Sequence, residues 1–293
     1  MSRCVAIVIL LFVTDARAEP ALWVTQGAHT KLYLFGTMHI LPKPMAWFDG
    51  EVKTAFDSSG SLWVEADVGL NNPSTTQSLT QDILRQGVDP AGNLWTDLPP
   101  ASAAAFRGEL AKCHMSPDHV AHFRPWLAAM IPEICDLQAQ SAAHAAFAKP
   151  ADVHPEEILL KSAAAGGKQI NYLETAAEQI GYFAAASKQA QLEQLQKSID
   201  DAVNGKDDFA VLETAWAKGD VAAITKVVAQ MRTGGEAAYQ VLLVQRNIRF
   251  AAKIKGLLAG KGTIFVAIGA AHLAGPDSVQ AQLTKLGVAT FRQ

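Results

Sequence analysis

The chain has 293 residues, of which 49% are hydrophobic and 18% are charged, and its formal net charge is −3. A chain of this length and composition can bury a large core, so its composition argues against a disordered protein. Proteins that bind nucleic acid usually carry a clustered excess of Lys and Arg, so we expect no nucleic-acid partner.

The first residues have the features of a secretory signal peptide. Arg3 provides a positive start, residues 4–13 are apolar, and residues 16–18 read Ala-Arg-Ala, a small-x-small cleavage site. The apolar run is well short of the roughly 20 residues that a helix needs to cross a bilayer. We therefore predict a signal peptide over residues 1–18 and a mature single domain over residues 19–293. This predicts a periplasmic or secreted protein with no transmembrane span after cleavage.

The N-terminal part of the mature chain alternates strands with a helix. Residues 21–26, 31–35 and 61–65 are rich in Val, Leu, Tyr and Trp and end in turn or polar residues, which predicts three strands. Between the second and third strands, apolar residues of segment 45–58 recur at helical spacing before a Ser-Ser-Gly stop. The first unit is therefore strand, strand, helix, strand.

The composition changes to Ala, Gln, Leu, Glu and Lys over about residues 73–260, which predicts a mostly helical middle with one short strand at 169–173. Near the C-terminus we predict a strand at 263–268, a helix at 276–286 and a final strand at 288–292. Because both ends are rich in strands, the sequence predicts an α/β fold. Its central mixed sheet is built from the two ends, with a large helical insertion packed beside it.

Two cysteines remain after removal of the signal peptide, Cys113 and Cys135. In an oxidising compartment an even pair of cysteines is a disulfide candidate. Two buried free thiols, which behave as small apolar side chains, are the alternative. The sequence leaves both interpretations open.

The same sequence motif, Gly-x-x-His after an apolar strand, occurs twice, near the two ends of the chain. Residues 33–42 read YLFGTMHILP and residues 265–276 read FVAIGAAHLAGP. Each is an apolar strand followed by Gly, two further residues, His and a turn that contains Pro. Loops that follow the carboxyl ends of strands bind ligands in α/β sheets. We therefore expect His39 and His272 to converge on one ligand if their strands are neighbours.

A carboxylate ends a third strand, at Glu65 in the sequence WVEAD. A buried acid is costly without a partner, so Glu65 needs a partner or a function. Together, His39, Glu65 and His272 match a site of two His and one carboxylate with open positions for water or substrate. We predict that these three residues bind a divalent ion, with Mn, Co and Zn as candidates.

Arg246 places a guanidinium on an otherwise apolar helical segment. It could pair with Glu65, hold a carboxylate or oxyanion of the substrate, or form a purely structural ion pair. The sequence does not decide among these roles. Its neighbours Asn247 and Arg249 are predicted to be solvent-facing or capping residues.

The ordered set of motifs resembles the TraB/GumN family, which is similar to the Tiki proteins and shares a broad superfamily with the erythromycin esterases and ChaN. The resemblance covers nearly the whole mature chain and rests on YLFGTMHILP, WVEAD, Arg124-Pro125-Trp126, Gly167-Lys168, Leu173-Glu174-Thr175, Glu178-Gln179, Arg246-Asn247 and FVAIGAAHLAGPDSV. It implies an erythromycin esterase/ChaN-like fold. Tiki relatives are metal-dependent proteases whose two His and one Glu correspond to His39, His272 and Glu65. The esterase relatives use the equivalent positions as acid–base groups without an obligatory metal.

These observations predict a metal-dependent hydrolase, with a peptidase as one candidate, that acts on a peptide or small-molecule substrate. In this hypothesis His39, Glu65 and His272 hold the ion and Arg246 steadies charge on the substrate. One alternative is a metal-free hydrolase in which His39 is the base and Glu65 orients it. Another is a non-enzymatic protein that binds a peptide or another ligand at the two turns.

Overall fold

The computed structural model describes residues 18–41, 45–67, 69, 73–136, 154–205 and 208–293. Its centre is a six-stranded sheet with the order β4-β3-β5-β2-β1-β6. The strands are β1 (Leu22–Gln26), β2 (Thr30–Thr37), β3 (Ser61–Val64), β4 (Gln169–Tyr172), β5 (Gly262–Gly269) and β6 (Phe291–Arg292). The sheet thus joins both ends of the chain, as the sequence predicts for this α/β fold, and it also takes in β4 from the middle, a place in the sheet that the sequence does not predict for this strand.

The four strands from β4 to β2 run parallel, whereas β1 is antiparallel to both of its neighbours. This makes the sheet mixed. In the pairing of β2 with β5, Thr37 lies opposite Gly269, so these two strands end side by side. The carboxyl ends of β2, β5, β3 and β4 therefore share one edge of the sheet, and the loops that follow them meet there.

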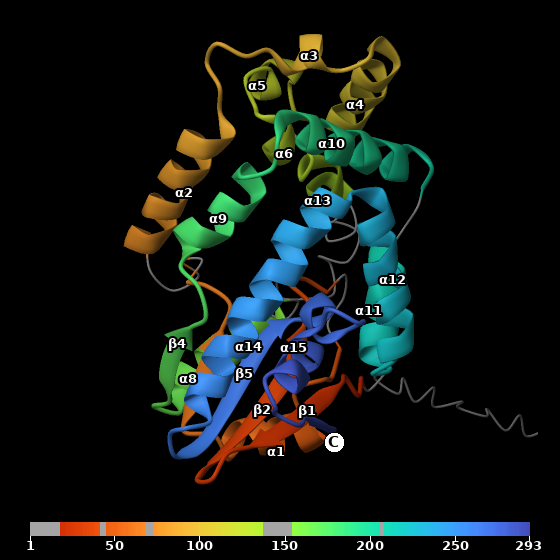
Figure 1. Ribbon diagram of the computed structural model, residues 1–293. Coiled ribbons are helices and arrows are strands. Elements are labelled where there is room, and N and C mark those ends of the chain that lie inside the picture. Colours follow the sequence, from red (N-terminus) through yellow and green to blue (C-terminus); the bar gives the residue numbers. More distant parts are fainter. Residues whose placement is uncertain (1–17, 42–44, 68, 70–72, 137–153, 206–207) are drawn as a thin grey trace, which may run out of the picture.

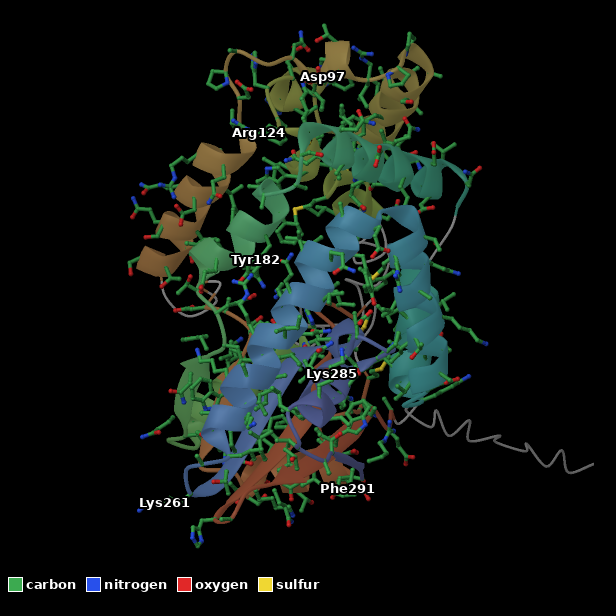
Figure 2. The ribbon with its side chains drawn as sticks, in the orientation of Figure 1. Asp97, Arg124, Tyr182, Lys261, Lys285 and Phe291 are labelled. Carbon is green, nitrogen blue, oxygen red and sulfur yellow. A yellow bond between two sulfur atoms is a disulfide. The ribbon has the colours of Figure 1, made fainter. Side chains whose placement is uncertain are left out.

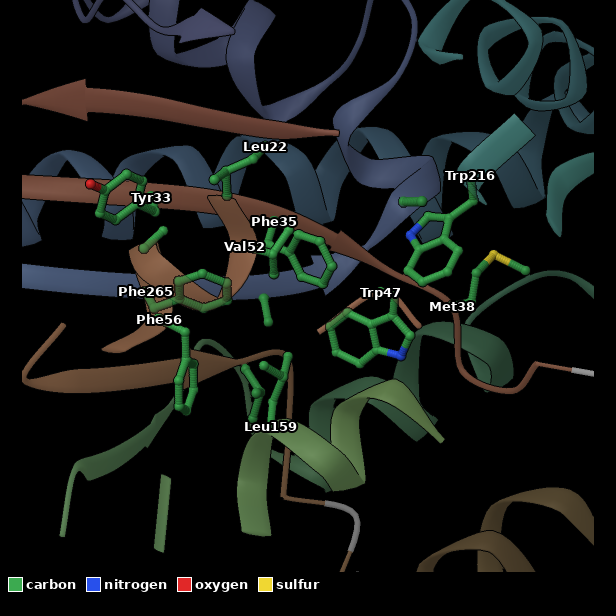
Figure 3. Packing of buried hydrophobic residues seen from close by; sticks show 14 of the residues in the cluster. Leu22, Tyr33, Phe35, Met38, Trp47, Val52, Phe56, Leu159, Trp216 and Phe265 are labelled. Atoms are coloured by element: carbon green, nitrogen blue, oxygen red, sulfur yellow. The ribbon is translucent and has the colours of Figure 1, made fainter. Parts of the chain in front are cut away.

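Both faces of the sheet are buried, which explains why β2 and β5 read as nearly continuous apolar runs. On one face, Phe35 and Phe265 pack with Trp47 and Trp216 in an aromatic cluster (Figure 3). On the other face, side chains such as Val266 pack against α14 and α15. The strand ends are thus held between two layers of helix.

The helices divide between those that cover the sheet and those that gather away from it (Figure 1). Those whose side chains join the two sheet cores are α1 (Gly50–Asp57), α8 (Pro155–Ala165), α11 (Asp208–Ala217), α12 (Val221–Gly234), α14 (Gln245–Leu257) and α15 (Val279–Lys285). The others include α2 (Pro73–Gly87), α3 (Leu94–Asp97), α4 (Pro100–Lys112), α5 (Pro117–Val120), α6 (Pro125–Ala128), α9 (Ala176–Ala184) and α10 (Lys188–Val203). Several of these build a separate core around Phe106 and Leu195.

A disulfide joins Cys113, just after α4, to Cys135 in the helical residues 131–136. Cys135 is buried in the core around Phe106. Of the two interpretations that the sequence left open, the structure has the disulfide. The bond ties together two helical segments of the region farthest from the sheet.

One long helix links that region to the sheet. It comprises α13 (Glu236–Tyr239), a π-helical turn η2 (Gln240–Val244) and α14, which follow one another without a break. The α13 end contacts α10, whereas α14 packs on the sheet and on α15. A π turn widens the helix by one residue and often occurs at functional sites.

Three predicted elements are shorter in the structure. The helix predicted over residues 276–286 is limited to α15, which begins at Val279 after the cap residue Ser278. The helix predicted over residues 45–58 begins only at Gly50, because Ala46 accepts a backbone hydrogen bond from Ala18 and Asp49 is extended. The strand predicted over residues 288–292 is limited to β6. The backbone before β6 is used elsewhere: the N–H of Val288 donates to Leu283, and the carbonyl of Ala289 accepts from Thr25.

The predicted signal peptide lies outside the described residues except for Ala18. That residue is buried, and its N–H donates to the carbonyl of Ala46 at 2.8 Å. The next residue, Glu19, donates its N–H to Ala217. Within the part of the chain that the structure describes, no helix has both the length and the apolar character needed to span a membrane.

Candidate active site

Glu65 directly follows β3 and is buried, with 5% of its surface exposed. Its Oε1 accepts the backbone N–H of Gly269 at 2.6 Å, and its Oε2 accepts from Arg246 at 2.7 Å and from Gln179 at 3.3 Å. Burial alone would raise the pKa of this carboxyl group. The nearby positive charges and the hydrogen bond from Gly269 outweigh burial and lower the pKa to about 2. Glu65 is therefore ionised at neutral pH.

Arg246, in the first turn of α14, is shared between two buried carboxylates. Besides its bond to Glu65, it contacts Glu174 through Nη2 to Oε1 at 2.5 Å and through Nε to Oε2 at 3.2 Å. This contact is bidentate, because two N–H groups of the planar guanidinium each donate to one oxygen of the Glu174 carboxylate. Burial raises the pKa of Glu174, and Arg246 opposes that rise. The contact with Glu65 is one of the roles that the sequence left open for Arg246.

Arg246 and its two carboxylate partners, Glu65 and Glu174, form a cluster that lies beside aromatic rings, between the sheet and α9. Its guanidinium is 5.3 Å from the ring centroid of Phe250 and 5.8 Å from that of Tyr182. Tyr182 on α9 marks this end of the sheet, whereas Lys261, which precedes β5, lies at the opposite end (Figure 2). The cluster therefore sits at the carboxyl ends of the parallel strands, where α/β proteins bind ligands.

His272 lies just beyond β5, in a short 3-10 turn, η3 (Ala270–Leu273), and is also buried. Its Nε2 is 3.6 Å from Oε1 of Glu65, and its Nδ1 is 2.5 Å from Oδ1 of Asn247. Burial is the largest of the effects that lower the pKa of His272, to about 4. The imidazole is therefore neutral at pH 7, and Glu65 and Asn247 lie on its two sides.

Two glycines allow the turns to approach one another and the carboxylate. A Cβ atom on Gly269 would lie 3.2 Å from Oε1 of Glu65, and one on Gly36 would lie 3.1 Å from Cα of Ala270. Both separations are tighter than ordinary van der Waals contact. The Gly in each Gly-x-x-His sequence thus keeps backbone close to the neighbouring strand end and lets the N–H of Gly269 reach Glu65.

His39 lies two residues beyond β2, in the neighbouring strand end, but its surroundings differ. Its side chain is 71% exposed, and its Nδ1 is 3.6 Å from Oε1 of Glu156 in the first turn of α8. The same carboxylate oxygen accepts a hydrogen bond from the hydroxyl of Thr37 at 3.2 Å. Interaction with Glu156 raises the pKa of His39 to about 9. His39 is close enough for its charge to help lower the pKa of Glu65 and His272.

The structure therefore brings together three of the four site residues that the sequence singled out. Glu65, Arg246 and His272 form one hydrogen-bonded and charged cluster, whereas His39 pairs with Glu156 at its margin. Among the described residues, no group of three or more His, Cys, Asp or Glu side chains surrounds a single metal position. Within the part of the chain that the structure describes, His39 pairs with Glu156 and not with Glu65, the residue that orients it in the metal-free alternative.

Two of the site's side chains fit an ion, nonetheless. Metal bonds to imidazole nitrogen and carboxylate oxygen are about 2.1 Å long, so two ligands of one ion lie roughly 3 to 4 Å apart. The 3.6 Å between Nε2 of His272 and Oε1 of Glu65 falls in that range. His39 would have to exchange Glu156 for the ion to complete the predicted set.

Sequence reasoning missed several residues of this site. The prediction that Asn247 faces solvent or caps the helix is wrong: its side chain is fully buried, because α14 packs on α15 and Asn247 contacts His272 and the carbonyl of Asp277 there. Arg249 is exposed, as predicted. Glu174 lies two residues beyond β4, close to where Glu65 follows β3, and its N–H donates to the carbonyl of Glu65. The shared position of these two acids at strand ends was the available signal for Glu174.

The fold and the cluster define a class: an α/β protein with a buried Glu–Arg–His site at the carboxyl ends of parallel strands. The sequence matches the profile of the TraB/PrgY/gumN family over residues 21–290. The chain belongs to this family. No curated protein and no solved structure gives a significant match.

Proposed function

We propose that this chain is an exported hydrolase whose reaction centre is formed by Glu65 and His272. The observation that carries the proposal is the 3.6 Å between Nε2 of His272 and Oε1 of Glu65, both buried at the ends of adjacent strands. When the imidazole is neutral, two acceptor atoms at this separation favour a proton donor or a cation between them. The disulfide between Cys113 and Cys135 supports export, because such bonds persist in oxidising compartments.

A divalent ion, with Mn, Co and Zn as the candidates, would be held by Glu65, His272 and His39. Imidazole nitrogen and carboxylate oxygen are ligand atoms that suit these ions, and the separation of Glu65 and His272 fits two ligands of one ion. When bound, the ion would polarise a water molecule or a carbonyl oxygen. His39 lies on the neighbouring strand end with an exposed side chain, which leaves it free to turn.

Without a bound ion, the protein's own groups can divide the proton transfers of a hydrolysis. Neutral His272 can accept a proton at Nε2 from an attacking water, and the Glu65 carboxylate stabilises the imidazolium that results. His39 is protonated at neutral pH and can donate a proton to the leaving group. Arg246 steadies the negative charge of Glu65 and that of a substrate oxyanion. The proposed substrates are peptides or small molecules with an ester or amide bond.

Metal binding is tested by calorimetry and elemental analysis of the purified protein with Mn, Co and Zn salts. We expect a stoichiometry near one, loss of binding in His272→Ala and Glu65→Gln, and loss in the double variant His39→Ala/His272→Ala. His119→Ala, which removes an exposed histidine outside the site, is the matched control and should bind normally. If the intact protein binds none of these ions, the metal part of the proposal is wrong.

The hydrolase itself is tested by incubating the protein with a peptide library and a panel of aryl esters, with product detection by mass spectrometry. We expect turnover that falls by about 100-fold or more in His272→Ala and Glu65→Gln, the scale of a lost acid–base group. Turnover equal to that of the wild type in both variants would exclude Glu65 and His272 as the reaction centre.

One observation favours a metal-free hydrolase as the second candidate. The carboxylate of Glu65 already accepts three hydrogen bonds, from Gly269, Arg246 and Gln179, and needs no ion to stabilise its charge. In this version His272 is the base, because it is the neutral histidine beside Glu65. Activity that persists at full rate in excess chelator would favour this version over the metal-dependent one.

A further inference from the structure

His272 lies between two hydrogen-bond acceptors that compete for one proton. A neutral imidazole carries a single N–H, on either Nδ1 or Nε2. Oδ1 of Asn247 is 2.5 Å from Nδ1, and Oε1 of Glu65 is 3.6 Å from Nε2. Without Asn247, the charged carboxylate would attract the proton to Nε2. The closer contact on the Nδ1 side opposes that attraction.

The side-chain amide of Asn247 is itself oriented. Its Nδ2 donates to the backbone carbonyl of Asp277 at 2.8 Å, so its Oδ1 must be the atom that faces His272. The side chain of Asp277 accepts a hydrogen bond from the hydroxyl of Tyr239 at 2.9 Å. Asn247 is fully buried, so water does not compete for these contacts. The acceptor at position 247 is therefore fixed before any ligand binds.

The oxygen of Glu65 that faces His272 is also occupied. Oε1 accepts the backbone N–H of Gly269 at 2.6 Å, and the other oxygen accepts from Arg246. Because Glu65 already accepts these hydrogen bonds, it is a weaker acceptor for an N–H of the imidazole. Both sides of the ring therefore favour the same tautomer, with the proton on Nδ1.

We propose that Asn247 is a positioning residue that holds His272 as the Nδ1–H tautomer, so that the Nε2 lone pair faces Glu65. The inference rests on the proposed function only for its purpose, since this lone pair is what accepts a proton or an ion. If the proton moved to Nε2, His272 would donate to Glu65, and the two groups would block one another. Partners that fix a ring in this way typically change metal affinity or activity by about 10–100-fold when mutated.

The test is a long-range ¹H–¹⁵N NMR spectrum of the ¹⁵N-histidine-labelled protein, recorded metal-free at neutral pH, with the His272 signals assigned from a His272→Gln variant. We expect the wild type to give the Nδ1–H pattern. Asn247→Leu, of similar size but without an acceptor, should shift the pattern to Nε2–H. Asn247→Asp keeps an acceptor and should retain a proton on Nδ1.

Two results would overturn the inference: an Nε2–H pattern in the wild type, or an unchanged Nδ1–H pattern in Asn247→Leu. The wild-type spectrum is decisive even if Asn247→Leu fails to fold. Because the spectrum needs neither metal nor substrate, an Nδ1–H pattern in a protein that lacks activity would refute the proposed function and leave the tautomer assignment intact. In a protein that binds metal, Asn247→Leu should weaken binding by about 10–100-fold and Asn247→Asp by less.

Discussion

The two Gly-x-x-His turns are nearly alike in sequence, and yet they place their histidines in opposite environments. The turn after β5 buries His272 between Glu65 and Asn247, and burial lowers the pKa of the ring to about 4. The turn after β2 leaves His39 exposed beside Glu156, which raises the pKa of that ring to about 9. At neutral pH one histidine is neutral and the other is charged.

The difference comes from what covers each turn. The β5 turn lies under α14, which supplies Asn247 and the ring of Phe250, 5.3 Å from that of His272. The β2 turn instead meets the first turn of α8, whose carboxylate Glu156 favours the charged imidazole. A strand end therefore fixes where a side chain starts, whereas the packing of neighbouring helices decides its protonation and its role.

The largest expected effect on stability comes from replacing Arg246, the cation beside the buried Glu65 and His272. Arg246→Met leaves Glu65 and Glu174 buried without their shared cation, and we expect it to lower the free energy of unfolding by about 3–5 kcal/mol. Arg249→Met, in the same helix and exposed, is the matched control and should cost less than about 1 kcal/mol. Urea denaturation measures both. Equal losses in the two variants would mean that the Glu65–Arg246–Glu174 cluster is not what stabilises this end of the sheet.

A smaller difference is expected between the two histidines themselves. His272→Ala removes a buried ring and leaves Oδ1 of Asn247 without its partner, so we expect a loss of about 2–4 kcal/mol. His39→Ala removes an exposed ring and should change stability by less than about 0.5 kcal/mol. Thermal and urea unfolding of the two variants side by side checks this. A loss in His39→Ala as large as that in His272→Ala would contradict the contrast between the turns.

The smallest effect is the pH dependence of stability, for which the two rings have opposite signs. His272 binds a proton in the unfolded chain near pH 6.5 and in the folded chain only near pH 4. Stability should therefore fall as the pH drops from 6.5 toward 4, by up to about 3 kcal/mol. The pKa of His39 is raised, so its contribution is complete below pH 6.5 and is lost as the pH rises toward 9. Because His39 is exposed, solvent screens this second contribution and makes it small.

Urea midpoints measured across this pH range for the wild type, His272→Gln and His39→Gln separate the two contributions. We expect His272→Gln to flatten the acidic limb above pH 4.5. In that range Glu65 is ionised in both the folded and the unfolded chain, because folding lowers its pKa from 4.5 to about 2, so Glu65 adds no pH dependence there. His39→Gln should flatten only the basic limb. An acidic limb that is as steep in His272→Gln as in the wild type would show that His272 is not the group responsible.

The sequence was sufficient to predict where β2, β3 and β5 end. Apolar runs that stop at Gly36, at Glu65 and at Gly269 mark strand ends directly, and parallel pairing then brings those ends together. The side-chain partners could not be predicted in this way. Asn247 and Glu156 come from helices whose positions depend on tertiary packing, and helical spacing alone does not say which face of a helix meets a given turn.

The π turn at η2 has a consequence for the geometry of the long helix. In a regular α-helix, Tyr239 and Asn247, eight positions apart, would point about 80° away from one another, since each residue advances by about 100°. The extra residue in the turn makes them equivalent to positions seven apart, which differ by about 20°. Both side chains can then reach Asp277 from the same side. A local widening of one helix thus supplies the alignment on which the orientation of the Asn247 amide depends.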